Sequence, residues 1–317
     1  MTRATIVFSV VLGALIPLSL VSGRVWVAPF DSLSASLILW ELRLPRTILA
    51  ISIGAGLGAA GAVMQGYLRN PLADPGLFGI APMAALGAVA SFWFDTNSNP
   101  ITLPLMSVGG AAIGMALLSI IAGKTGGIAL FTLAGLMIAS LAGSLTALMI
   151  TLSPSAFAIS EIVIWLNGAL TDRSWLEVQI ALPLIALGTL LFFFSSKGLD
   201  ALTLGTVTAR SLGIRMDFVL LLLICGSGLV IGASVAVAGI IGFVGLIVPH
   251  LVRPLTNYMP SSLIIPSALA GACLLLAADI FVRVLPLNTE LRLGIALSLI
   301  GAPFFLLLLM RMRRERV

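Results

Sequence analysis

A stretch near the N-terminus, Glu41 to Gly79, constrains the fold of this chain more than any other. It reads ELRLPRTILAISIGAGLGAAGAVMQGYLRNPLADPGLFG. Two arginines precede an apolar, glycine-laced segment that is long enough to cross a bilayer at about 1.5 Å per residue. A polar turn with two prolines follows at once. This order predicts a membrane helix with one end suited to docking and the other suited to gating.

The composition excludes a water-soluble domain. Hydrophobic residues make up 60% of the 317 residues, charged residues make up 9%, and the mean hydropathy is +1.18. Soluble domains carry about 25% charged residues. The net charge of +5 does not indicate a nucleic-acid-binding protein, because the basic residues lie in short loops and at the C-terminus without interleaved aromatics. We therefore expect a polytopic membrane protein that has the lipid bilayer as its partner and binds no nucleic acid.

The sequence contains ten apolar segments that are candidates for membrane helices, on the criterion that one crossing needs roughly 20 apolar residues. Residues 218–248 are too long for one crossing and too short for two, so we expect a long helix ending near Ala236 and a short helix from Gly239 to Val248. Irregular backbone at that depth is tolerated where it is buried in protein or lines a cavity. The sequence predicts an all-α fold with ten transmembrane helices in a single domain, residues 1–317. The other eight segments are residues 4–20, 47–64, 76–94, 103–122, 128–152, 178–194, 261–284 and 291–310.

Glycines recur at helical spacing in two of these segments. Gly54, Gly58 and Gly61 share one helical face, and a second set is Gly239, Gly242 and Gly245. Small residues at this spacing let helix backbones approach closely in lipid, so both sets are predicted to mark packing contacts.

The distribution of Lys and Arg predicts the orientation in the membrane. With a cytoplasmic N-terminus and ten crossings, most of the 17 basic residues fall on the cytoplasmic side, as the positive-inside rule requires. Both termini are therefore predicted to be cytoplasmic. The basic residues left on the outer side are Arg24, Arg43, Arg46, Arg173, Arg283 and Arg292.

The chain lacks obvious means to drive transport itself. No GxxxxGK[ST] loop for nucleotide binding occurs. Ion-coupled carriers keep ionisable residues inside the membrane, and Asp279 is the only acidic residue within a predicted span. Arg283 follows four residues later on the same helix, so a local ion pair is the expected role of Asp279. An ion-coupled secondary transporter, or a pore acting without an ATPase, stays open as an alternative, because half-length helices are common at carrier binding sites.

A polar intrusion on the cytoplasmic side, LDALTLGTVTARSLGI from Leu199 to Ile214, suggests where energy enters. Its apolar residues alternate with polar ones, and Gly205 and Gly213 divide it into short pieces. One interpretation is a helix that lies on the membrane surface. The other is a docking element that fills a groove on a partner protein.

The chain resembles the FecCD-type permeases of type II ABC importers along nearly its whole length. The resemblance rests on RLPRTILA, AGAVMQGYLRNPLADPGLFG, LDALTLGTVTARSLG, GFVGLIVPHLVR, ALAGACLLLAADIFVR and ELRLGIALSLIGAPFF, in that order. It implies a dimer of identical or paralogous permeases in the inner membrane, two ATPase subunits and a periplasmic binding protein. It also implies that this chain is not an enzyme and holds no cofactor, since ATP and Mg would bind to the ATPase subunits.

The resemblance also implies roles for particular residues. Docking of the binding protein falls to Arg43, Arg46 and Arg283, for which exposed arginines pairing with carboxylates give a physical reason. The cytoplasmic gate is assigned to Asn70, Pro71 and Leu72, and a periplasmic gate to Ser153, Pro154 and Ser155. A cytoplasmic coupling segment, residues 199–215, would contact the ATPase through Leu204, Gly205, Ala209, Arg210, Ser211, Leu212 and Gly213.

The function expected from these patterns is ATP-driven uptake of a metal-containing compound from periplasm to cytoplasm. Ferric siderophore is the first expectation for the cargo, followed by haem and cobalamin. The residues do not name the cargo, because selectivity would reside mostly in the binding protein.

Overall fold

The computed structural model describes the chain except for residues 1–2, 24–25, 27–32, 95, 97–98, 123–127, 154, 288 and 315–317. The described residues form helices and turns, without strands among them. In chain order the helices are α1 (Arg3–Val21), α2 (Leu33–Leu37), the π-helix η1 (Ile38–Arg43), α3 (Leu44–Leu68), the 3-10 helix η2 (Pro75–Leu77), α4 (Ile80–Trp93), α5 (Thr102–Ala122), α6 (Ile128–Thr151), α7 (Ala156–Leu166), α8 (Trp175–Leu202), α9 (Thr206–Ser211), α10 (Met216–Ala238), α11 (Val244–Val252), the 3-10 helix η3 (Arg253–Leu255), α12 (Pro260–Val284) and α13 (Leu293–Arg314).

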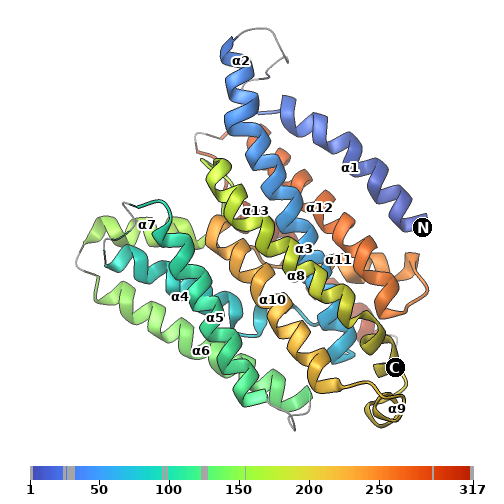
Figure 1. The fold of residues 1–317 in the computed structure, drawn as a ribbon. Helices are drawn as coiled ribbons and strands as arrows, with labels where there is room; N and C mark the ends of the chain where they lie inside the picture. Colours follow the sequence, from blue (N-terminus) through green and yellow to red (C-terminus); the bar gives the residue numbers. More distant parts are fainter. Residues whose placement is uncertain are drawn as a thin grey trace.

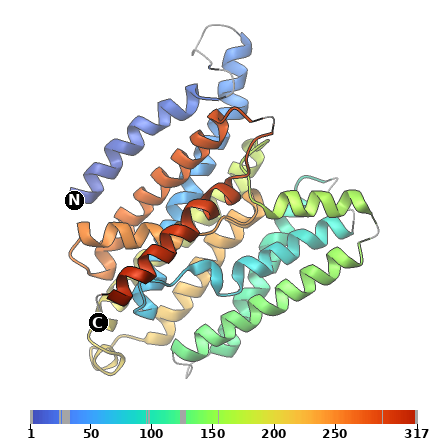
Figure 2. The same ribbon diagram turned by 180° about the vertical axis from the view of Figure 1, so that it is seen from behind.

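The long helices form one bundle whose two ends differ. Figure 1 shows α2 and α9 at opposite ends, with the long helices running between them, and Figure 2 shows α13 crossing the reverse face toward the C-terminus. We call these the α2 end and the α9 end. Hydrogen bonds link distant segments at both, from Arg43 to the carbonyl of Leu20 at the α2 end and from Arg69 to the carbonyl of Leu202 at the α9 end.

The predicted all-α membrane fold is confirmed. Within the described ranges, seven helices are long and apolar enough to cross a membrane, and four more apolar helices are shorter. Each of the ten predicted segments contains a helix, but α7 lies outside all of them. Its 11 residues are too few for a crossing, which is why the count based on span length missed it and why ten is an approximate number.

The predicted start of the second span, at Thr47, is wrong. Residues 34–68 form one continuous helical stretch of 35 residues, so both arginines of the RLPR motif lie inside it. Pro45 has no N–H, and its ring collides with the carbonyl four residues earlier in a regular helix. The π-helical turn η1 directly before it widens the helix there, which lets the helix pass the proline.

Helix α3 lies at the centre of the bundle, where its small residues allow close contact. A Cβ atom at Gly54 would lie 2.4 Å from the carbonyl oxygen of Gly271 on α12, and one at Gly58 would lie 2.2 Å from that of Ser267. The glycine stripe on α3 is therefore a packing surface, as the spacing predicted. The bundle positions its functional segments around this helix.

The half-helix is also confirmed, although it begins later than predicted. Gly239, with φ of 69°, ends α10, and α11 starts at Val244 instead of Gly239. The irregular backbone of residues 239–243 between them borders a cavity, which is the condition under which such backbone is tolerated at membrane depth.

Candidate functional site

The three arginines assigned to docking are buried at the α2 end. Arg43 and Arg46 are each 9% exposed and Arg283 is 6% exposed. The expectation that they are exposed is therefore wrong for this chain. Arg43 donates two hydrogen bonds across to the end of α1, to the carbonyls of Leu20 at 2.7 Å and Val21 at 2.6 Å.

An ion network joins α3 to α12 at this end. Asp279 is fully buried, and its Oδ1 accepts hydrogen bonds from Nε and Nη2 of Arg46 at 2.9 and 2.7 Å. Its Oδ2 lies 2.9 Å from Nη2 of Arg283, so the predicted pair between Asp279 and Arg283 is confirmed. Arg46 is the partner that sequence spacing missed, because it lies 233 positions away.

Glu290 extends this network into the loop between α12 and α13. It pairs with Arg46 and also accepts a hydrogen bond from Thr171 Oγ1 at 3.4 Å. Burial alone would raise the pKa of Glu290, but the hydrogen bond and the charge of Arg46 lower it below its usual value. The carboxylate is therefore held in its charged form, and the three arginines have structural contacts here. Their role in docking stays a prediction.

The residues assigned to the cytoplasmic gate lie in a turn between α3 and α4, residues 70–79, which we call the gate turn. Arg69 ends α3 in the left-handed conformation, with φ of 50°. The backbone N–H of Leu72 then donates to Oδ1 of Asn70 at 3.0 Å, and that of Ala73 donates to the carbonyl of Asn70 at 3.1 Å. Asn70 thus shapes the turn, and Pro71 and Leu72 are half-buried beside it. The predicted span from Gly76 is wrong, because α4 begins only at Ile80.

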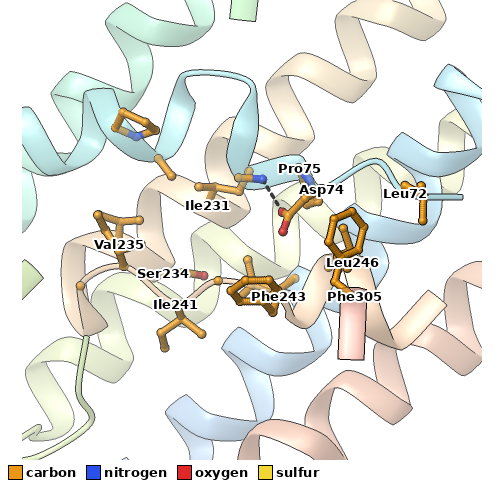
Figure 3. A pocket seen from close by; sticks show the side chains of 18 residues that line it. Leu72, Asp74, Pro75, Ile231, Ser234, Val235, Ile241, Phe243, Leu246 and Phe305 are labelled. Carbon is orange, nitrogen blue, oxygen red and sulfur yellow. Dashed lines mark hydrogen bonds between the residues drawn. The ribbon is translucent and has the colours of Figure 1, made fainter. Parts of the chain in front are cut away.

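A cavity of about 310 Å³ borders the gate turn. Figure 3 shows Leu72 and Asp74 of the turn at this cavity, with side chains from α10, α11 and α13 around it. Among the described residues that line it, most are apolar and Asp74 is the one charged residue. Burial raises the pKa of Asp74 above its usual value, against the opposing effect of backbone N–H groups of Gly76 and Phe243. The lining from the other helices includes Ile231, Val235, Phe243, Leu246 and Phe305.

Gln65 is a further candidate functional residue, to which the sequence motifs assigned no role. Its side chain is buried near the end of α3 and bonds to both the gate turn and α11. A buried amide must find hydrogen-bond partners, so a glutamine directly after a glycine- and alanine-rich apolar span was a usable signal.

The coupling segment forms the α9 end. Gly205, with φ of 106°, precedes α9, and Gly213, with φ of 82°, follows it, so the predicted breaks are confirmed. Leu204 and Leu212 are 64% and 62% exposed, whereas Ala209 is fully buried. Arg210 and Ser211 are exposed. The segment therefore presents large apolar side chains outward, and Ala209 packs inward instead of facing a partner.

The residues assigned to a periplasmic gate lie before α7. Ser155 caps this helix, since its Oγ accepts the backbone N–H of Phe157 at 3.2 Å. Oγ of Ser153 donates to the carbonyl of Ser155 at 3.3 Å, and Pro154 lies outside the described residues. Ser153 lies just after the end of α6 and Ser155 at the start of α7, and their gating role stays a prediction.

Metal ligands do not gather in the part of the chain that the structure describes. No group of three or more His, Cys, Asp or Glu side chains there could hold an ion. The described site combines an apolar cavity, a polar turn and an exposed apolar end.

Comparisons with known proteins agree with this geometry. Residues 7–311 match the FecCD transport family. The vitamin B12 import system permease protein BtuC of Salmonella newport (strain SL254) is 36% identical over 301 residues, covering 94% of this chain and 91% of that protein. BtuC of Citrobacter koseri is 34% identical over 310 residues, covering 96% and 93%. A solved structure described as "An inward-facing conformation of a putative metal-chelate type ABC transporter" superposes with a TM-score of 0.90 at 29% identity, covering 97% of this chain and 98% of that chain. The chain belongs to the FecCD transport family and is a permease of the type II ABC importer kind.

Proposed function

We propose that this chain is the permease subunit of an ATP-driven importer that moves a metal chelate from the periplasm to the cytoplasm. The observation that carries this proposal is the α9 end, where Val207 on the short helix α9 and Leu204 and Leu212 on either side of it are 62–79% exposed, with Gly205 and Gly213 both at positive φ. A free surface of this kind suits a groove on a soluble partner, and the gate turn begins at the same end of the bundle.

Metal chelates are the proposed cargo class. The relatives reported above are named for vitamin B12 import, and the similar solved structure is described as metal-chelate type. Cobalamin is a metal chelate, so it is the first compound to test, and ferric siderophores and haem belong to the same class. An apolar cavity with one carboxylate makes few directed contacts, which fits a passage in which the binding protein selects the cargo.

The proposed assembly contains a second permease, identical or paralogous, two ATPase subunits and a periplasmic binding protein. Both termini would be cytoplasmic in the inner membrane, with the α9 end inside and the α2 end outside. At the α2 end a carboxylate of the binding protein would reach Arg46 only by displacing Glu290, because Arg46 is 9% exposed and already paired. Docking through Arg43, Arg46 and Arg283 therefore requires an exchange of ion pairs.

Reconstitution tests the function. The complex of this permease with its ATPase subunits is placed in liposomes with the binding protein, and uptake of labelled cyanocobalamin, ferrichrome and haemin is measured with ATP inside. We expect ATP-dependent uptake of one of the three probes. Uptake driven by a proton gradient without the ATPase would overturn the proposal in favour of a secondary transporter.

A further inference from the structure

Two polar side chains fasten the gate turn to α11. Oδ1 of Asp74 accepts the backbone N–H of Gly76 at 2.8 Å within the turn. Asp74 lines the same cavity as Phe243, the residue that directly precedes α11, and the backbone N–H of Phe243 acts on this carboxylate to lower its pKa. Phe243 adopts the left-handed conformation, with φ of 67°, which is uncommon for an aromatic residue and therefore indicates strong local constraint. The contact between Asp74 and Phe243 bridges two segments far apart in sequence.

Gln65 makes the second connection. Its Nε2 lies within hydrogen-bonding distance of the carbonyls of Leu246 at 3.2 Å and Gly245 at 3.4 Å in α11, and of Ala73 at 3.5 Å in the gate turn. Its Oε1 accepts a hydrogen bond from Nη2 of Arg253, just beyond the end of α11, at 2.9 Å. One buried amide thus contacts the turn and both ends of the half-helix.

Close packing at Gly245 also joins these parts beside the cavity. A Cβ atom at Gly245 would lie 2.7 Å from ring atoms of Pro75 in the gate turn. On the other side, a Cβ atom at Gly61 of α3 would lie 1.9 Å from the carbonyl oxygen of Gly245. Sliding the turn along α11 would break hydrogen bonds in surroundings where water cannot replace them.

We propose that Asp74 and Gln65 are positioning residues that lock the gate turn to α11, so that the turn and the half-helix move as one unit when the gate opens. The inference rests on the proposed function, since it assumes that the turn gates a passage. It deepens that function by naming α11 as the helix with which Leu72 of the gate turn moves. Arg253, just beyond α11, is then the other end of the unit that moves. If the gate turn moved alone, Asp74 and Gln65 would lose their contacts with α11 and with the residue that precedes it.

Disulfide cross-linking tests whether the unit stays intact. Pro75→Cys and Gly245→Cys are introduced together into a chain with Cys225→Ser and Cys273→Ala, because the short distance at Gly245 puts the two sulfurs within reach of each other. Disulfide formation is measured in the complex with its ATPase subunits when nucleotide-free, ATP-bound and vanadate-trapped. We expect equal cross-linking in all three states. Loss of cross-linking in any state would overturn the proposal.

Controls separate packing from the lock itself. The single variants Pro75→Cys and Gly245→Cys report on folding, and the pair Ala73→Cys with Leu246→Cys replaces the first pair if it does not fold. Adding Asp74→Ala and Gln65→Leu should lower cross-linking about fivefold in one trapped state, the shift that one net hydrogen bond supports. Asp74→Asn, which keeps an acceptor oxygen, should not. Equal cross-linking in every state with both polar residues removed would show that packing alone holds the turn, and the lock assignment would be wrong.

The uptake of labelled cyanocobalamin by the unmodified complex is measured in parallel. A complex that traps vanadate and cross-links equally in all states, but moves none of the probes, contradicts the proposed function and supports the lock. A complex that moves a probe but loses cross-linking in one state supports the function and contradicts the lock.

Discussion

The two ends of the bundle differ in which side chains they bury, and each does the opposite of what its residue types suggest. At the α2 end, arginines with an apparent docking motif are buried among carboxylates and carbonyls. At the α9 end, leucines that would ordinarily be buried are more than 60% exposed. The charged groups at the α2 end pair with other groups of the same chain, whereas the apolar side chains at the α9 end lie on its surface. The difference supports the proposal that a partner covers the α9 end, and it shows that the arginines at the α2 end already have partners within this chain.

The largest expected effect concerns Arg46 at the α2 end. Arg46→Ala leaves Asp279 buried with Arg283 alone and removes the ion-pair partner of Glu290. Breaking a buried ion pair from one side costs about 3–5 kcal/mol. We expect the detergent-solubilised variant to unfold at a much lower temperature than the wild type, in a thermal unfolding measurement.

Two further variants show whether the effect arises from the network. Arg210→Ala, at an exposed position of α9, should leave the unfolding temperature unchanged. Replacing the three buried members, with Arg46→Met, Asp279→Leu and Arg283→Met, should recover part of the loss, because only the partly exposed Glu290 then keeps a charge of the network without its partner. An Arg46→Ala variant as stable as the wild type would break the comparison, since the α2 end would then resemble an ordinary docking surface.

The second prediction concerns the α9 end. Leu204→Asp with Leu212→Asp should abolish co-purification of the ATPase subunits, because each charge would enter a buried interface without a partner. The permease itself should keep its unfolding temperature, since both side chains are exposed and such changes shift stability by about 0.5 kcal/mol or less. Pull-down with tagged permease measures the first effect.

A matched pair of substitutions sharpens this result. Thr203→Asp with Thr208→Asp adds the same charge at exposed polar positions of the same segment, and should retain more of the ATPase. Full retention by the leucine variant would mean that the exposed leucines face lipid, as in the surface-helix interpretation.

Sequence reasoning succeeded where a local pattern determines the structure. Hydropathy located the spans, and the glycines at 205 and 213 located both breaks around α9. It failed where the partner is distant. Arg46 pairs with Glu290, which lies 244 positions away, so no local spacing could reveal that the guanidinium is buried. The second span was predicted to start at Thr47 from its apolar residues, whereas the helical stretch begins earlier and passes Pro45 through a π-helical turn.

The third prediction lies between the two ends, on α3. Gly61→Ala places a Cβ atom 1.9 Å from the carbonyl oxygen of Gly245, so the two helices must separate. Overpacking of this kind costs about 1–3 kcal/mol. Gly242→Ala is the control, because nothing lies within 4 Å of its added Cβ. We expect a lower unfolding temperature for the first variant and a much smaller change for the second. Equal stability of the two would show that α3 and α11 are not in tight contact.

The smallest expected effect is the pH dependence of the α2 end. The pKa of Glu290 is lowered in the folded chain, so folding favours its charged form. Its contribution to the free energy of unfolding is present above its ordinary pKa of 4.5 and is lost as the pH falls through the lower folded value. Glu290→Gln should therefore be less stable than the wild type at pH 7, by about 1 kcal/mol for a partly exposed ion pair. The difference should shrink as the pH falls from 4.5 toward the lower folded pKa, because the unfolded wild-type chain then binds a proton that the folded chain does not yet bind. Thermal unfolding of both variants across pH 3.5 to 7 measures this, with the exposed Glu41→Gln as a control that should follow the wild type. A stability difference that stays constant with pH would mean that the charge of Glu290 does not stabilise the network, and that only its shape holds the loop to α3.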